Sequence, residues 1–129
     1  LELANLKFLF EKPNCIFFNL QYGDIKKEVA DFNNKTNKKI ISIKNLDLFN
    51  DFESLVDVLC SLDIFITVSN STAHLAGALG IKTYLIKPDN HASYHYWNYN
   101  SGLTPWYSSV KIIKKENLLD KKFIESKIT

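Results

Sequence analysis

The spacing of apolar residues along the chain predicts short strands that alternate with helices. Five apolar runs bounded by turn-forming residues have the length of buried strands, at 15–20, 40–43, 64–68, 83–86 and 110–113. Helical spacing joins several of them, at 25–33, 51–62 and 72–79, and occurs again at 3–10 and 118–128. Asp24 is expected to cap the helix over 25–33, and Gly80 to end the helix over 72–79.

Strands that alternate with helices indicate βαβ units with right-handed crossovers and a parallel sheet. The predicted fold class is therefore α/β, a three-layer sandwich with a five-stranded, mostly parallel sheet. Residues 64–68 are apolar on both faces of the strand, so we expect this strand to be central. Burial is expected for the side chains of Phe65, Ile66, Tyr84 and Ile86. An α+β domain is the alternative architecture.

The length and composition restrict the function. A chain of 129 residues is expected to form a single domain, 1–129. It contains no methionine, not even at position 1, as expected of a piece of a longer protein. The longest apolar runs are too short to cross a membrane, and a net charge of +2 is too small to indicate nucleic acid binding. Cys15 and Cys60 are expected to be buried, unpaired and reduced, which favours a cytoplasmic location.

Residues 69–80 are the stretch with candidate chemistry, because small polar residues connect a strand to a helix there. The first N–H groups of a helix lack intrahelical partners and attract anions, so a diphosphate fits at this position. The chain has no arginine to hold such an anion. We expect free N–H groups at Ser71, Thr72 and Ala73, hydroxyl donors on Ser71 and Thr72, and His74 beside the ligand. The structural alternative is that Asn70 or Ser71 only caps the helix and His74 belongs to the core.

Two further features have competing interpretations. Six aromatic residues lie within 94–107, and they either stack on a base or sugar or attach a long loop to the sheet. His91 and His95 are four residues apart, but zinc needs more ligands, so no metal site is expected.

The strand-to-helix stretch 69–80 resembles the nucleotide-sugar signature in the C-terminal half of GT-B-fold glycosyltransferases. It is most similar to bacterial tetratricopeptide-repeat glycosyltransferases and to the ADP-heptose heptosyltransferase family. Three other segments agree in the same order: 18–24 with the family's first strand and loop, 55–68 with the helix and strand before the signature, and 104–110 with a late Ser-Pro-Trp-Tyr-Pro segment. The resemblance implies a Rossmann-like sheet in the strand order 2-1-3-4-5, which would bring the loop after the first strand to the signature.

The resemblance also implies a function, binding of a nucleotide diphosphate sugar for metal-independent, inverting glycosyl transfer, with no separate cofactor. The acceptor site and general base of such enzymes come from an N-terminal half, which would be this chain's partner. The alternative is a degenerate, non-catalytic interaction module. Many relatives have Asp where this chain has Ser69, and a Trp-Arg-Trp cluster where it has residues 94–97. No catalytic residue is assigned, and the expected substrate-binding residues are Gln21, Tyr22, Ser69, Asn70, Ser71, Thr72, Ala73, His74 and Trp97.

Overall fold

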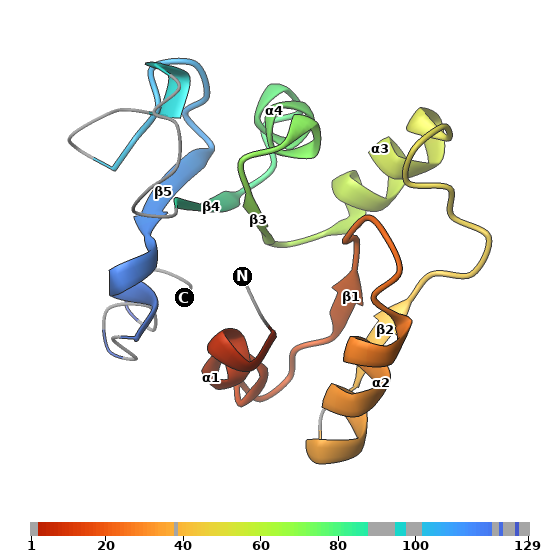
Figure 1. Cartoon of the computed structure of the whole chain (residues 1–129). Coiled ribbons are helices and arrows are strands. Elements are labelled where there is room, and N and C mark those ends of the chain that lie inside the picture. Colours follow the sequence, from red (N-terminus) through yellow and green to blue (C-terminus); the bar gives the residue numbers. More distant parts are fainter. Residues whose placement is uncertain are drawn as a thin grey trace. The chain divides into compact units, whose positions relative to one another are not determined.

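A computed structural model describes residues 3–37, 39–87, 95–97, 102–119, 122 and 126. Its helices and strands follow the alternation that the sequence predicts (Figure 1). The chain divides into two compact units, Leu1–Leu55 and Val56–Thr129, and each is described by itself.

The first unit holds two short strands and the helices next to them. Its elements are η1 (Leu3–Leu6), α1 (Lys7–Phe10), β1 (Phe17–Asn19), α2 (Lys26–Lys35) and β2 (Ile40–Ser42). The second unit holds most of α3 (Phe52–Ser61), followed by β3 (Phe65–Val68), α4 (Ser71–Ala78), β4 (Thr83–Lys87), η2 (His95–Trp97), β5 (Val110–Lys114) and η3 (Lys115–Leu119). Except in η3 and at two single positions, the helix expected over 118–128 lies outside the described residues.

The core of the first unit is an aromatic and aliphatic cluster between its helices and its sheet. Phe10 of α1 packs against Phe17 of β1 and Phe32 of α2, with ring centroids 4.6 and 4.7 Å apart. Strands β1 and β2 are parallel, with Phe17 opposite Ile40. Ile40 is buried in the same cluster as Phe10 and Phe32. Burial of these side chains is the main source of stability for so small a unit.

Helices α2 and α3, each 10 residues long, begin in different ways. The carboxylate of Asp51 accepts the backbone N–H of Ser54 at 3.0 Å, which caps α3. The expected cap of α2 by Asp24 is wrong, because Ile25 occupies the capping position and no side chain bonds there. The chain turns at Gly23, whose φ is +88°, and this turn places Asp24 one residue too early to cap the helix.

Strand β4 is the centre of the sheet in the second unit. The order is β3-β4-β5 and both pairings are parallel. The first four residues of β4 are buried, and Tyr84, Leu85 and Ile86 are at most 1% exposed. Within this three-stranded sheet β3 lies at the edge, so the central position expected for 64–68 is not found there and stays part of the prediction of a five-stranded sheet. Phe65 is buried, but Ile66 is only half-buried, as an edge position explains.

The α/β class with parallel strands is thus confirmed, and each of the five predicted strands is present. The strands form one sheet of two and another of three.

Helix α3 shows where the predicted burial holds and where it fails. Leu55 and Leu59, four residues apart, are 2% and 0% exposed, whereas Phe52 at the start of the helix is 57% exposed. Both cysteines are unpaired, as predicted, but their predicted burial is wrong. Cys60 follows Leu59 and is turned about 100° away from the buried stripe. Cys15 lies in the exposed irregular segment before β1.

Within the described residues, the helices are all too short or too polar to cross a membrane.

Truncation of a central side chain tests the β4 core. Leu85 is 0% exposed, so Leu85→Ala should lower the free energy of unfolding by about 2–5 kcal/mol, since it removes buried methyl groups and leaves a cavity. Leu79→Ala, at a position 37% exposed, should change it by less than about 1 kcal/mol. Urea denaturation followed by circular dichroism measures both variants, and equal losses would contradict the described core.

Candidate functional site

The candidate site is built around the start of α4, directly after the carboxyl end of β3 (Figure 1). Asn70 has an extended backbone, and its side-chain oxygen accepts the N–H of Ala73 at 2.9 Å. Its amide nitrogen donates to the hydroxyl of Thr67 at 3.2 Å. Asn70 therefore caps α4 and is itself held by β3, so the helix leaves the sheet in a defined direction.

The other end of α4 is equally defined. Gly80 has a φ of +74°, its N–H donates to the carbonyl of Gly77, and the N–H of Ile81 donates to that of Ala76. This pair of bonds is the Schellman arrangement, which favours glycine at the left-handed position. The predicted end of the helix at Gly80 is confirmed.

The expected donors at the helix start are not equivalent. The N–H of Ala73 was expected to be free, but it is bonded to Asn70, because the cap uses this donor. Thr72 is 4% exposed, so its side chain belongs to the core. Ser71, at the first helical position, is exposed. The exposed polar surface of this turn therefore centres on Ser71.

Aromatic side chains from the loop after β4 surround His74. The ring centroids of Trp97 and Tyr96 lie 4.6 and 4.8 Å from that of His74. Tyr107 is 5.7 Å away by centroid, and its hydroxyl lies 3.0 Å from Nδ1 of His74. His74 thus joins the helix to two separate segments of the loop.

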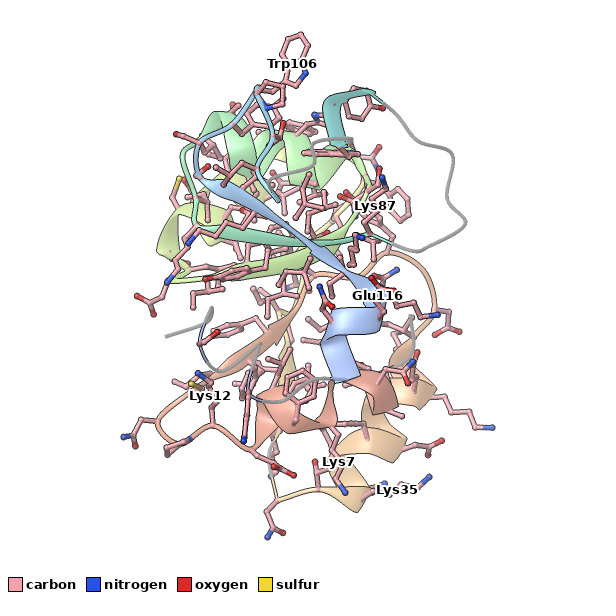
Figure 2. All side chains as sticks on the ribbon, turned by 90° about the vertical axis from the view of Figure 1, so that its left-hand side faces the viewer. Lys7, Lys12, Lys35, Lys87, Trp106 and Glu116 are labelled. Carbon is pink, nitrogen blue, oxygen red and sulfur yellow. The ribbon has the colours of Figure 1, made fainter. Side chains whose placement is uncertain are left out.

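Trp97 is buried rather than displayed. It is 3% exposed, and its indole N–H donates to the hydroxyl of Ser69 at 3.0 Å. Together with Ala73, Leu85 and Val110 it forms the core on this side of the sheet. These contacts favour the interpretation that the aromatic residues attach the loop. Trp106 is different, since it is 61% exposed and projects from the ribbon (Figure 2).

The ring of Tyr107 lies against the backbone of α4 at Gly77. A Cβ atom at Gly77 would stand 2.5 Å from Cγ of Tyr107, closer than real Cβ contacts allow. The hydroxyl of Ser109 also donates to the carbonyl of Gly77, at 3.4 Å. The loop can therefore pack against α4 only because Gly77 has no side chain.

The surroundings of His74 also affect its charge. Burial lowers the pKa of His74 from its ordinary value of 6.5, because desolvation disfavours the imidazolium ion. The side chains packed around it are the rings of Tyr96, Trp97 and Tyr107. The neutral form of His74 is therefore favoured at neutral pH.

The structure brings together seven of the nine expected substrate-binding residues, Ser69 to His74 and Trp97. Gln21 and Tyr22 follow β1 in the first unit. The N–H of Gln21 donates to the side chain of Asn19, and the ring of Tyr22 lies 5.1 Å from that of Phe49. These two residues thus belong to the first unit, whereas the α4 site belongs to the second.

Sequence reasoning missed Tyr107 and Gly77 as parts of the site. The signals were present, since Tyr107 belongs to the aromatic loop and Gly77 to the row of small residues. Their pairing is a contact between positions 30 residues apart in the chain, which no local pattern reports.

The histidines offer no metal centre among the residues described. No group of three His, Cys, Asp or Glu side chains there could hold an ion. His91 lies outside the described residues, and only the backbone of His95 is described.

The fold and site define an α/β unit with a capped helix N-terminus at the carboxyl end of a parallel strand. The chain is 29% identical over 104 residues to Protein FlbA of Caulobacter vibrioides (strain ATCC 19089 / CIP 103742 / CB 15). The match covers 81% of the chain but 17% of FlbA, so the chain spans less than a fifth of that protein's length. No protein-family model and no solved structure matches the chain.

Substitution of Gly77 tests the contact with Tyr107. Within a helix, alanine is about 1 kcal/mol more favourable than glycine. We nevertheless expect Gly77→Ala to destabilise the protein by about 1–3 kcal/mol, because the Cβ of the new alanine meets the Tyr107 ring. In a Tyr107→Ala background the same change should be neutral or stabilising. Urea denaturation of the four proteins gives the coupling free energy, and additive effects would refute the contact.

The lowered pKa of His74 predicts a pH dependence of stability. The unfolded chain binds the His74 proton more tightly than the folded chain, so this residue should destabilise the fold as the pH falls through 6.5. Between about pH 7.5 and about pH 5.5, the wild type should therefore lose more stability than His74→Gln, which cannot titrate. Denaturation curves at both pH values supply the comparison. Identical losses would show that His74 is not desolvated.

Proposed function

We propose that this chain is the donor-binding, C-terminal half of a GT-B-fold glycosyltransferase that binds a nucleotide diphosphate sugar. The observation that supports it best is the first turn of α4. This turn follows a parallel strand directly, is held by the Asn70 cap, and exposes Ser71 beside the half-buried His74. A helix N-terminus in this position is suited to bind phosphate oxygens.

The diphosphate would meet backbone N–H groups, the Ser71 hydroxyl and the His74 ring. With no arginine in the sequence, the partial positive charge of the helix N-terminus is the main attraction for the anion. The same groups would stabilise the charge that develops on the departing diphosphate. The proposed transfer is therefore independent of a metal, and inversion at the anomeric carbon is expected, as in the heptosyltransferases that the sequence resembles.

The proposed fold joins the two units as one Rossmann-like domain. Both sheets are parallel, and β1 paired with β3 would complete a five-stranded sheet in the order 2-1-3-4-5. Gln21 and Tyr22, after β1, would then lie next to the α4 turn, at the switch point where α/β proteins bind ligands. One face of the β1–β2 pair, with Phe18 and Ile41 each 43% exposed, would be covered in this domain.

The remaining parts of the proposed enzyme lie beyond this chain. An N-terminal half would supply the acceptor site and the general base, and tetratricopeptide repeats would precede it. In this proposal the protein is cytoplasmic, in agreement with its two free cysteines.

The alternative function is a degenerate transferase half that serves as an interaction module. It is favoured by the internal use of polar groups at the site, since Ser69 is bonded to Trp97 and the N–H of Ala73 to Asn70. The exposed Trp106 and Leu103 are apolar side chains that a protein partner could cover. This function requires no nucleotide binding.

A charge reversal at Ser71 distinguishes the two functions. The wild type should bind a nucleoside diphosphate at roughly millimolar affinity, about −4 kcal/mol, because the closing half is missing. Ser71→Glu should abolish binding, since its carboxylate occupies the place of a phosphate. It should not destabilise the fold, because a negative charge favours a helix N-terminus. Titration with UDP, GDP and ADP, followed by amide chemical shifts, measures this.

Ser71→Gln is the matched control, because it has the same size without the charge and should retain binding within about threefold. If none of the three nucleotides perturbs residues 69–74, or if Ser71→Glu leaves the shifts unchanged, the donor site is refuted and the interaction module takes its place.

A further inference from the structure

The hydrogen bond between Tyr107 and His74 joins the loop to the proposed donor site. The hydroxyl oxygen of Tyr107 and Nδ1 of His74 are 3.0 Å apart, and both side chains are half-buried. The position of the phenol is fixed from the other side, because its ring lies against Gly77. Within the described part of the chain, no hydrogen-bond partner is found for Nε2 of His74.

The direction of this hydrogen bond decides which nitrogen of His74 carries the proton. A neutral imidazole has one N–H donor and one acceptor nitrogen. A phenol donates its proton readily, whereas its oxygen is a weak acceptor because a lone pair is delocalised into the ring. Donation from Tyr107 to Nδ1 therefore leaves the proton of His74 on Nε2.

We propose that Tyr107 is a positioning residue of the donor site, whose hydroxyl donates to Nδ1 of His74 and thereby presents Nε2–H as a donor to a diphosphate oxygen. This inference rests on the proposed function. The rings of Trp97 and Tyr96, 4.6 and 4.8 Å from His74, restrict the rotation of the imidazole. Tyr107 then selects its tautomer.

This arrangement would supply a side-chain hydrogen-bond donor to a site that has no arginine. Two donors near the helix start are already used, the N–H of Ala73 by Asn70 and the indole N–H of Trp97 by Ser69. A neutral imidazole already carries a proton on Nε2, so it can donate to the diphosphate without first taking up a proton from solvent. Preorganised donors of this kind favour a developing oxyanion. The lowered pKa of His74 agrees with the neutral form.

The tautomer can be observed directly in the whole 129-residue chain labelled with 15N-histidine. At about pH 7.5, the wild-type His74 spectrum should show the Nε2–H form. Tyr107→Phe keeps the ring against Gly77 but removes the hydroxyl, so His74 should become a mixture of both tautomers. An Nδ1–H form in the wild type, or an unchanged spectrum in Tyr107→Phe, overturns the proposed direction of the bond.

Binding of inorganic pyrophosphate, followed by amide shifts, tests the positioning role. Tyr107→Phe should weaken pyrophosphate binding about 3- to 10-fold, because it removes the hydrogen bond that orients His74. His74→Gln places an amide donor near the position of Nε2 and should bind within about threefold of wild type. His74→Asn reaches only the Nδ1 position, so it can still bond Tyr107 but should lose affinity as Tyr107→Phe does.

The outcomes separate the two proposals. If the wild type binds pyrophosphate at residues 69–74 and Tyr107→Phe binds it equally well, the positioning role is wrong and the donor site stands. If His74→Asn binds as tightly as His74→Gln, Nε2 is not the donor and the positioning role again fails. If neither pyrophosphate nor any nucleotide binds the wild type, the proposed function fails, and the positioning role fails with it.

Discussion

The contact of the Tyr107 ring with Gly77 is the constraint on which the α4 region depends. The ring occupies the space that any side chain at Gly77 would need, with Cγ 2.5 Å from the place of a Cβ. Ala73 and Ala76, also on this helix, are 0% exposed. Small residues thus let the helix approach both the sheet and the returning loop, and close packing of this kind is sensitive to a single methyl group.

Once the loop is held there, its polar atoms find partners at the end of β3. Trp97 donates to Ser69, and Tyr107 lies within hydrogen-bond distance of His74. Buried N–H and O–H groups of aromatic side chains require such partners, since an unsatisfied group costs about 1–3 kcal/mol. The polar residues after β3 are consequently divided between structure and surface. Ser69, Asn70 and Thr72 serve the fold, whereas Ser71 is exposed and His74 is half-buried among aromatic rings.

The surface ion pair between Lys114 and Glu116 adds little to stability. The ion pair of Lys114 and Glu116 is 3.6 Å long and its side chains are 70% and 60% exposed, so solvent screens it. Figure 2 shows Lys7 and Lys35 pointing into solvent from their helices. The N-terminus of α4, where Asn70 caps the helix, carries the partial positive charge of the helix dipole.

The sequence by itself determined the order and type of the elements. Apolar runs and helical spacing are local properties, so the five strands, the α4 turn and its end at Gly80 followed from neighbouring residues. The tertiary structure alone decided which residues of that turn stay accessible. Asn70 takes the N–H of Ala73, Trp97 takes the hydroxyl of Ser69, and Gly77 receives Tyr107. The last two contacts join positions about 30 residues apart, and burial of the edge strand β3 likewise depends on which strands pair with it. Such choices depend on packing between distant segments, which no local pattern in the chain encodes.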